Sequence, residues 1–151
     1  RLAIVLQQMW KQHLGVEVGL FNQEWKTYLN TQSAMDYQIT RAGWIGDYPD
    51  PNTFLDLFVT DGGNNKTGWS NASYDKLIDE AGQTADQQVR MKKFVQAEKI
   101  LMRELPVLPI YVYTHGRLVS SKLKMQVDGK TVPWVANEMN RILLKHYLIE
   151  P

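Results

Sequence analysis

Residues Arg41 to Pro51 read RAGWIGDYPDP, and in this stretch the chain leaves regular structure. The residues that lead into it, 37–44, alternate between apolar and polar side chains, which predicts a strand. Glycine, aspartate and two prolines follow, and these residue types favour a turn. A tryptophan and a carboxylate at the end of a strand indicate either a solvated turn or a binding site.

The sequence before this stretch predicts an α/β fold. Apolar residues recur at helical spacing over 2–13, and Gly15 is suited to end that helix. Alternation over 16–20 predicts a first strand, and Asn22 is expected to cap a short helix before the strand at 37–44. This order of helix, strand, helix and strand favours a mixed sheet with flanking helices.

The sequence after it predicts two longer helices that follow a surface loop. Residues 60–71 contain paired glycines and asparagines, which supply turn conformations. Ser73 is expected to cap the first helix and Asp86 the second. The second helix has a core-facing stripe of Phe94, Ala97, Leu101 and Leu105.

The last third of the chain is expected to contain two more strands. VLPIYVY at 107–113 predicts a third strand, and Pro109 places it at an edge or a crossing. The chain from Ser120 is expected to be irregular until a final strand within 140–149.

Composition excludes several classes of protein. The 151 residues carry a formal net charge of +1 without blocks of Lys or Arg, so no nucleic-acid partner is expected. No apolar run approaches the ~20 residues that a membrane span needs. The chain has no cysteine, which excludes disulfides and thiolate metal sites. No cofactor is expected.

The enzyme motifs are weak. Ser70 in GWSNA loosely resembles a nucleophile elbow, but a loop precedes it where that motif needs a strand. A small hydrolase that uses Ser70 and Asp47 stays as an alternative, and it requires a histidine near Ser70. The three histidines are far apart in the sequence: His13, His115 and His146.

Three further polar patterns are weak evidence for a functional site. Asp47 and Asp50 lie in DYPD, where backbone capping is more common than acid–base chemistry. Asn65 and Asn71 each begin a tripeptide that matches the N-glycosylation pattern, a weak signal.

Asp47 is the strongest binding candidate. It follows Gly46 and a strand that ends at Trp44, where an indole can screen a carboxylate from water. A ligand ammonium or a cation of the protein would then pair with it. Arg41 is either that internal cation or a donor to a ligand carboxylate.

Four blocks in this order carry a family resemblance: EVGLFNQEWKTYLNTQSAMDYQITRAGW, RAGWIGDYPDPNTFLDLF, NNKTGWSNASYDKLIDEA and QAEKILMRELPVLPIYVYTHGRLV. Together they resemble the C-terminal part of the oligopeptide/dipeptide substrate-binding proteins of ABC importers. The resemblance covers nearly the whole chain, most firmly residues 16–119.

This resemblance implies a fold and a role. The fold is the two-lobed, periplasmic-binding-protein-like α/β fold (type II), in which residues 1–113 form part of the second lobe. Residues 114–151 would cross the hinge and return to the first lobe. The role is peptide capture for uptake at the periplasmic or extracellular face of a bacterial membrane, not catalysis. The partners would be the permease subunits, and any membrane association would run through them or through a lipid anchor outside this stretch.

The resemblance also implies roles for individual residues. Asp47 corresponds to the aspartate that holds the ligand's α-amino group, and Arg41 lies where an arginine approaches the ligand carboxylate. Trp44 and Tyr113 would line the ligand cleft.

Ile45 and Gly46 occupy a variable stretch of the family pattern, so the pocket beside them need not match other members. Related proteins of the same fold bind oligosaccharides, nickel chelates or opines, and such a solute is the alternative to a peptide. Asp47 favours a ligand with a free amino group.

Overall fold

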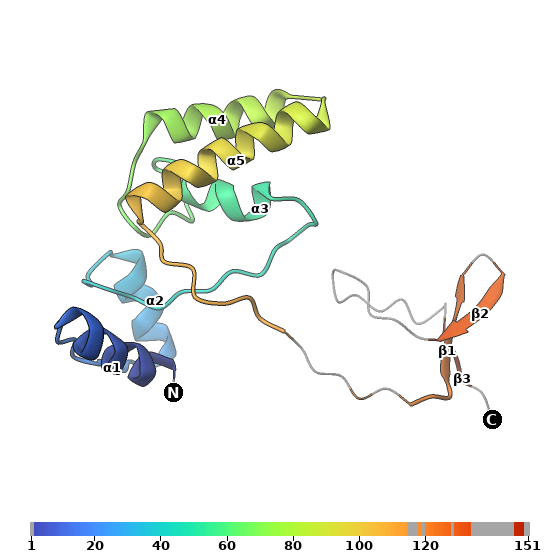
Figure 1. Cartoon of the computed structure of the whole chain (residues 1–151), viewed down its shortest axis with the longest axis horizontal. Helices are drawn as coiled ribbons and strands as arrows, with labels where there is room; N and C mark the ends of the chain where they lie inside the picture. The colour runs from blue at the N-terminus through green and yellow to red at the C-terminus, as the bar shows by residue number, and fades with distance from the viewer. Residues whose placement is uncertain (1, 115–117, 119, 128, 134–146, 150–151) are drawn as a thin grey trace. The chain divides into compact units, whose positions relative to one another are not determined.

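A computed structural model describes residues 2–114, 118, 120–127, 129–133 and 147–149 (Figure 1). Its helices are α1 (Leu2–Leu14), α2 (Trp25–Ser33), α3 (Asn52–Leu55), the 3-10 turn η1 (Asp56–Phe58), α4 (Ala72–Gln83) and α5 (Gln87–Glu104). Its strands are β1 (Leu123–Val127), β2 (Lys130–Pro133) and β3 (Tyr147–Ile149). The chain divides into two compact units, residues 1–42 and 43–151.

The first unit contains α1 and α2 and has no buried side chain among residues 2–42. Helix α1 ends as expected, because Gly15 has a φ of +66° and takes the left-handed conformation that glycine tolerates best. The chain then folds back on the helix, since the Gln7 side chain donates to the Val18 carbonyl. Apolar side chains of α1 are exposed: Leu2, Ile4, Val5, Met9 and Leu14.

Helix α2 is capped by Glu24, which corrects the expectation that Asn22 caps it. The Glu24 carboxylate accepts from the backbone N–H groups of Lys26 and Thr27 at 2.9 and 3.2 Å. These hydrogen bonds lower the pKa of Glu24, since they stabilise its charged form. Glu24 lies two positions after Asn22, and its side chain reaches the free N–H groups of the first turn.

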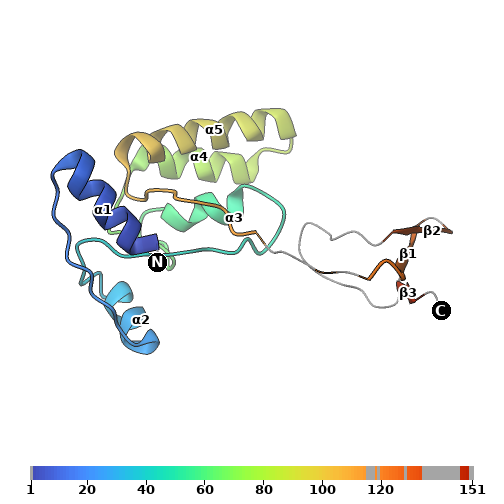
Figure 2. The same ribbon diagram turned by 60° about the horizontal axis from the view of Figure 1, so that its bottom comes forward.

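The core of the second unit lies between α4 and α5, which run side by side (Figures 1 and 2). This pairing confirms the core-facing stripe expected of α5 at Phe94, Ala97 and Leu101. Six apolar residues are buried there: Tyr74, Ile78, Ala81, Phe94, Ala97 and Leu101. The short helix α3 lies against α5, so the turn that precedes it is attached to this core.

The ends of α4 and α5 agree only in part with expectation. Asp86 caps α5 as expected, through the N–H groups of Gln88 and Val89. Asn71 and not Ser73 caps α4, because its side chain reaches the free N–H groups of the first turn. Leu105 was expected in the core, but it takes a left-handed conformation at the end of α5 (φ +51°) and is half exposed.

The strands expected at 16–20, 37–44 and 107–113 are absent as paired strands from this chain. Alternating polarity predicts an extended backbone, but a strand also needs a neighbour for its N–H and C=O groups. Residues 107–113 do keep a strand-like trait: the rings of Tyr111 and Tyr113, two residues apart, meet edge to face with centroids 4.8 Å apart.

A three-stranded antiparallel sheet, in the order β2-β1-β3, occupies part of the segment that was expected to be irregular from Ser120. Strand β1 pairs with β2 through Met125 and Val132, and with β3 through Met125 and Tyr147. The Asp-Gly pair before Lys130 is a hairpin signal that the sequence reading missed. Of the final strand expected within 140–149, residues 140–146 lie outside the described residues, and the described part of it is β3.

No helix in the described part of the chain combines the length and the apolar character needed to cross a membrane.

Candidate functional site

The candidate residues fall in both units. Trp44, Ile45, Gly46 and Asp47 lie together at the start of the second unit, whereas Arg41 belongs to the first. Trp44 and Ile45 are 39% and 84% exposed, so both present apolar surface to solvent. In the first unit, the carbonyl of Arg41 accepts a hydrogen bond from the Tyr28 hydroxyl, which attaches the end of this unit to α2.

Tyr113 lies beside the same segment although it is far away in the sequence. A Cβ atom added to Gly43 would meet Cε2 of Tyr113 at 3.6 Å, an ordinary van der Waals distance. The ring of Tyr113 therefore packs next to the residue that precedes Trp44, and it is still about half exposed. The structure thus brings the two expected aromatic residues of the cleft to neighbouring positions.

Gly46 packs tightly against α3. A Cβ atom at this position would lie 3.1 Å from Thr53 Cγ2 and 3.1 Å from Phe54 Cζ, closer than most Cβ contacts. The backbone of Gly46 therefore approaches α3 more closely than any other residue type permits without displacement. The sequence predicts that Gly46 favours a turn. The structure adds a second role for this glycine, because its backbone lies close to α3.

Asp47 is held by its backbone while its carboxylate stays exposed. Its N–H donates to Oγ1 of the buried residue Thr53 at 3.0 Å. Among the described residues of its own unit, no Lys or Arg side chain forms an ion pair with the Asp47 carboxylate. Burial, together with the nearby charge of Asp47, raises the pKa of Asp56. The Asp47 carboxylate is therefore part of a locally negative surface.

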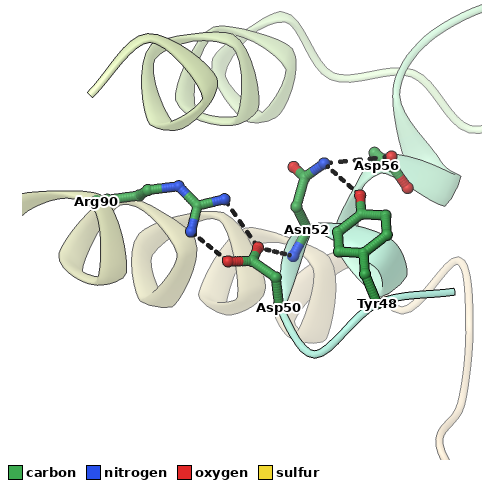
Figure 3. A network of polar contacts seen from close by, with 5 residues as sticks. All are labelled: Tyr48, Asp50, Asn52, Asp56 and Arg90. Atoms are coloured by element: carbon green, nitrogen blue, oxygen red, sulfur yellow. Dashed lines mark hydrogen bonds and ion pairs between the residues drawn. The ribbon is translucent and has the colours of Figure 1, made fainter. Parts of the chain in front are cut away.

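Asp50 anchors this turn to α5 through Arg90 (Figure 3). The guanidinium donates to both carboxylate oxygens, with Nη2 to Oδ1 at 2.8 Å, and the Asn52 N–H also donates to Oδ1, at 2.9 Å. The hydrogen bond from Arg90 is the main reason that the pKa of Asp50 is lowered. Asp50 thus caps the start of α3, the role expected from DYPD, and also joins the turn to the core.

The polar contacts continue along the turn from Asn52. Its Nδ2 donates to the Tyr48 hydroxyl at 3.1 Å and to Oδ2 of Asp56 at 3.3 Å (Figure 3). One amide therefore joins an aromatic residue of the turn to η1. The sequence reading did not identify this network.

Arg90 had a signal that the sequence reading overlooked. It lies four residues before Phe94 on the same helical face as Ala97 and Leu101, all of which are buried. A cation in line with a core-facing stripe predicts a carboxylate partner, because a charge is seldom half-buried without one. The partner is 40 residues away in the sequence, so its identity required the tertiary structure.

The loop before α4 uses its polar residues for its own structure. The Asn65 side chain donates to the carbonyls of Phe58, Val59 and Trp69 at 2.9–3.3 Å. Asn71 caps α4 and also donates to Oε1 of Glu104 at 2.9 Å. Both asparagines of the glycosylation patterns therefore have structural partners.

The described residues provide neither a metal site nor a site for a serine hydrolase. Among the described residues, no group of three or more His, Cys, Asp or Glu side chains is placed to hold a metal ion. The alternative of a serine hydrolase depended on a histidine near Ser70, and His115 and His146 lie outside the described residues.

Known proteins match the chain in sequence. Residues 1–66 match the sequence model of Bacterial extracellular solute-binding proteins, family 5 Middle. The chain is 42% identical over 124 residues to the periplasmic murein peptide-binding protein MppA of Escherichia coli, and 43% identical over 125 residues to the oligopeptide-binding protein OppA of Bacillus subtilis. Each match covers 82% of this chain but only 23% of the relative, so the chain spans about a quarter of their length.

The fold matches as well. The crystal structure of Haemophilus influenzae OppA in complex with RPPGFSPFR superposes with a TM-score of 0.78 at 33% identity. That match covers 98% of this chain and 28% of the other. It confirms the expected α/β, periplasmic-binding-protein-like fold class, in a family made of solute-binding proteins. Over the length that is matched, the chain is therefore similar in sequence and fold to the bacterial extracellular solute-binding proteins of family 5.

Proposed function

We propose that this chain is the part of an ABC importer's substrate-binding component that carries the site for the amino end of a peptide ligand. In this proposal Asp47 pairs with the ligand's α-amino group, and the role is binding and not catalysis. The matched relatives named for peptide binding support the ligand class.

The observation that carries the proposal is the state of Asp47. Its backbone is fixed by Thr53 and its carboxylate is exposed without an ion pair to any described residue of its unit. A ligand ammonium supplies the missing cation, and a hydrogen bond to a charged group is worth ~1.5–3 kcal/mol. The absence of such an ion pair among the described residues of the second unit supports a ligand ammonium as the partner of Asp47.

The neighbouring residues suit an extended peptide. Trp44, which follows Gly43, and Tyr113, which packs next to Gly43, both offer exposed aromatic surface near the turn. Arg41 is proposed to approach the ligand carboxylate, since its planar fork of donors matches that group. A binder of many peptides must use what all peptides share, and the termini and backbone are common to all of them.

The remaining parts of the proposal concern the larger protein. Residues 1–113 belong to its second lobe, and residues 114–151 cross the hinge toward the first. The protein works at the periplasmic or extracellular face of the bacterial membrane and delivers its ligand to the permease subunits. The periplasmic relative MppA supports that location.

The test is isothermal calorimetry on the full-length protein with a peptide and its N-acetylated form. We expect Asp47→Ala to weaken binding of the free-amine peptide more than tenfold, with the melting temperature nearly unchanged because the side chain is exposed. Asp79→Ala removes an exposed carboxylate of α4 that accepts a hydrogen bond from the Gln83 side chain, and it serves as the matched control. Equal peptide affinity for the parent and Asp47→Ala contradicts the assignment.

A further inference from the structure

We propose that Arg90 is a positioning residue for ligand binding: its ion pair with Asp50 holds the turn that carries Asp47 in the geometry that receives an amino group. The inference rests on the proposed function, because the position of Asp47 matters to a ligand only if Asp47 binds one.

Arg90 is fixed to the core of the second unit. Its guanidinium carbon lies 4.6 Å from the centroid of the Phe94 ring, and Phe94 is only 2% exposed. The side chains of Arg90 and Asp50 are 16% and 27% exposed, so water competes little with their pairing. A planar cation that is stacked on a ring and donates to both oxygens of one carboxylate has a single favourable orientation. Helix α5 therefore presents a rigid attachment point.

Asp50 is connected to Asp47 by hydrogen bonds that run through Thr53. The backbone carbonyl of Asp50 accepts from the Thr53 N–H at 3.2 Å, while the Asp50 carboxylate holds the adjacent Asn52 N–H. Oγ1 of Thr53 in turn accepts from the Asp47 N–H at 3.0 Å. Three consecutive contacts thus join the Arg90 guanidinium to the backbone of Asp47. The tight packing of Gly46 against Thr53 leaves this backbone little room to move independently.

A purely stabilising role is the competing explanation of the ion pair. Removing either partner leaves the other charge half-buried, and this lowers stability whatever the pair does for the ligand. A melting temperature therefore does not separate the two roles. The separating quantity is amine discrimination, defined as the Kd for an N-acetylated peptide divided by the Kd for the same peptide with a free amine. A change beyond that of a variant that loses the same charge elsewhere on α5 reports a change in the geometry at Asp47.

The experiment measures amine discrimination by calorimetry on the full-length protein, well below its melting temperature. Arg90→Ala is compared with Lys93→Ala, which removes a second partly buried cation of the same helix. Lys93 pairs with Glu80 of α4 and not with the turn. Arg90→Lys keeps the positive charge but cannot donate to both oxygens of Asp50 in the same planar geometry. This variant replaces Arg90→Ala in the experiment if the alanine variant does not fold. Asp50→Asn keeps an oxygen for the Asn52 N–H and removes the ion pair.

We expect Arg90→Ala and Asp50→Asn to reduce amine discrimination about tenfold, Arg90→Lys to reduce it less, and Lys93→Ala to leave it unchanged. Affinity for the acetylated peptide should stay constant throughout. If Asp47→Ala abolishes discrimination while the Arg90 variants retain it, the positioning role is wrong and the proposed function stands. Equal loss of affinity for both peptides in Arg90→Ala also overturns the positioning role. If Asp47→Ala itself keeps discrimination, the proposed function fails first.

Discussion

The helices of the first unit and the α4–α5 pair of the second have similar local signals but very different packing. In residues 2–42 no side chain is buried, and Phe21 is 85% exposed. Between α4 and α5, Tyr74 and Phe94 are almost fully enclosed. Helix formation needs only local spacing and caps, whereas most of the stability of a helix comes from the surface that it buries. In this chain only the second unit has that surface among its described residues.

The first consequence concerns the aromatic residues. Phe94→Ala should lower the free energy of unfolding by about 3–5 kcal/mol, because it leaves a cavity between α4 and α5. Phe21→Ala, the matched change in the first unit, should change it by no more than about 0.5 kcal/mol. Urea unfolding followed by tryptophan fluorescence measures both. Similar losses for the two variants would show that the first unit has a core in solution.

The helix caps allow a smaller test. Asn71→Ala removes the cap of α4 and the bond to Glu104, and it should cost about 1 kcal/mol in the cooperative transition. Glu24→Ala removes the cap of α2 and should reduce the helical circular dichroism without moving that transition. A shift of the transition by Glu24→Ala would mean that the two units unfold together.

Two non-glycine residues with positive φ lie just after helices, one in each unit. Leu105 (φ +51°) follows α5 and Met35 (φ +55°) follows α2. Leu105→Gly should raise the free energy of unfolding by about 0.5 kcal/mol, since relief of left-handed strain exceeds the added entropy of the unfolded chain. Met35→Gly should leave the cooperative transition in place. Thermal unfolding by circular dichroism checks both, and destabilisation by Leu105→Gly would show that the contacts of this side chain outweigh its strain.

Acid titration gives the smallest expected effect. Hydrogen bonds from Trp69 and Asn71 lower the pKa of Glu104 in the folded state. The ionised Glu104 side chain therefore stabilises the fold above pH ~4.5, and this stabilisation is lost as the pH falls through the folded-state pKa of Glu104. Glu104→Gln should flatten this acid decline of stability. Glu24, whose pKa is also lowered, lies in the first unit, and Glu24→Gln should leave the decline unchanged. Urea midpoints at several pH values decide between these outcomes, and an unchanged acid decline in Glu104→Gln would remove Glu104 from the explanation.

The sequence predicted local features better than pairings. The cap at Asp86 and the apolar stripe through Phe94 are confirmed, because both depend on residues within a few positions. The caps expected at Asn22 and Ser73 were each wrong by two positions, since neighbouring polar side chains compete for the same N–H groups. The strand at 37–44 was wrong as a paired strand, because pairing depends on distant residues.

In the candidate site too, the sequence predicted local features but not the long-range contact. The sequence pointed to the turn at Gly46 and Asp47, and the roles of Asp47, Trp44, Arg41 and Tyr113 stay predictions. Its reading of Asp50 as a backbone cap is confirmed by the Asn52 N–H. It did not identify the ion pair between Asp50 and Arg90, which joins residues 40 positions apart.

By itself, the sequence predicted the longer helices, the turn and the residue types of the candidate site, because backbone preferences, caps and apolar spacing act over a few residues. Only the tertiary structure decided which extended segments find partners, how closely Gly46 packs against α3, and which cation holds the turn. These contacts join residues distant in sequence, and their geometry exists only after α4 and α5 have packed.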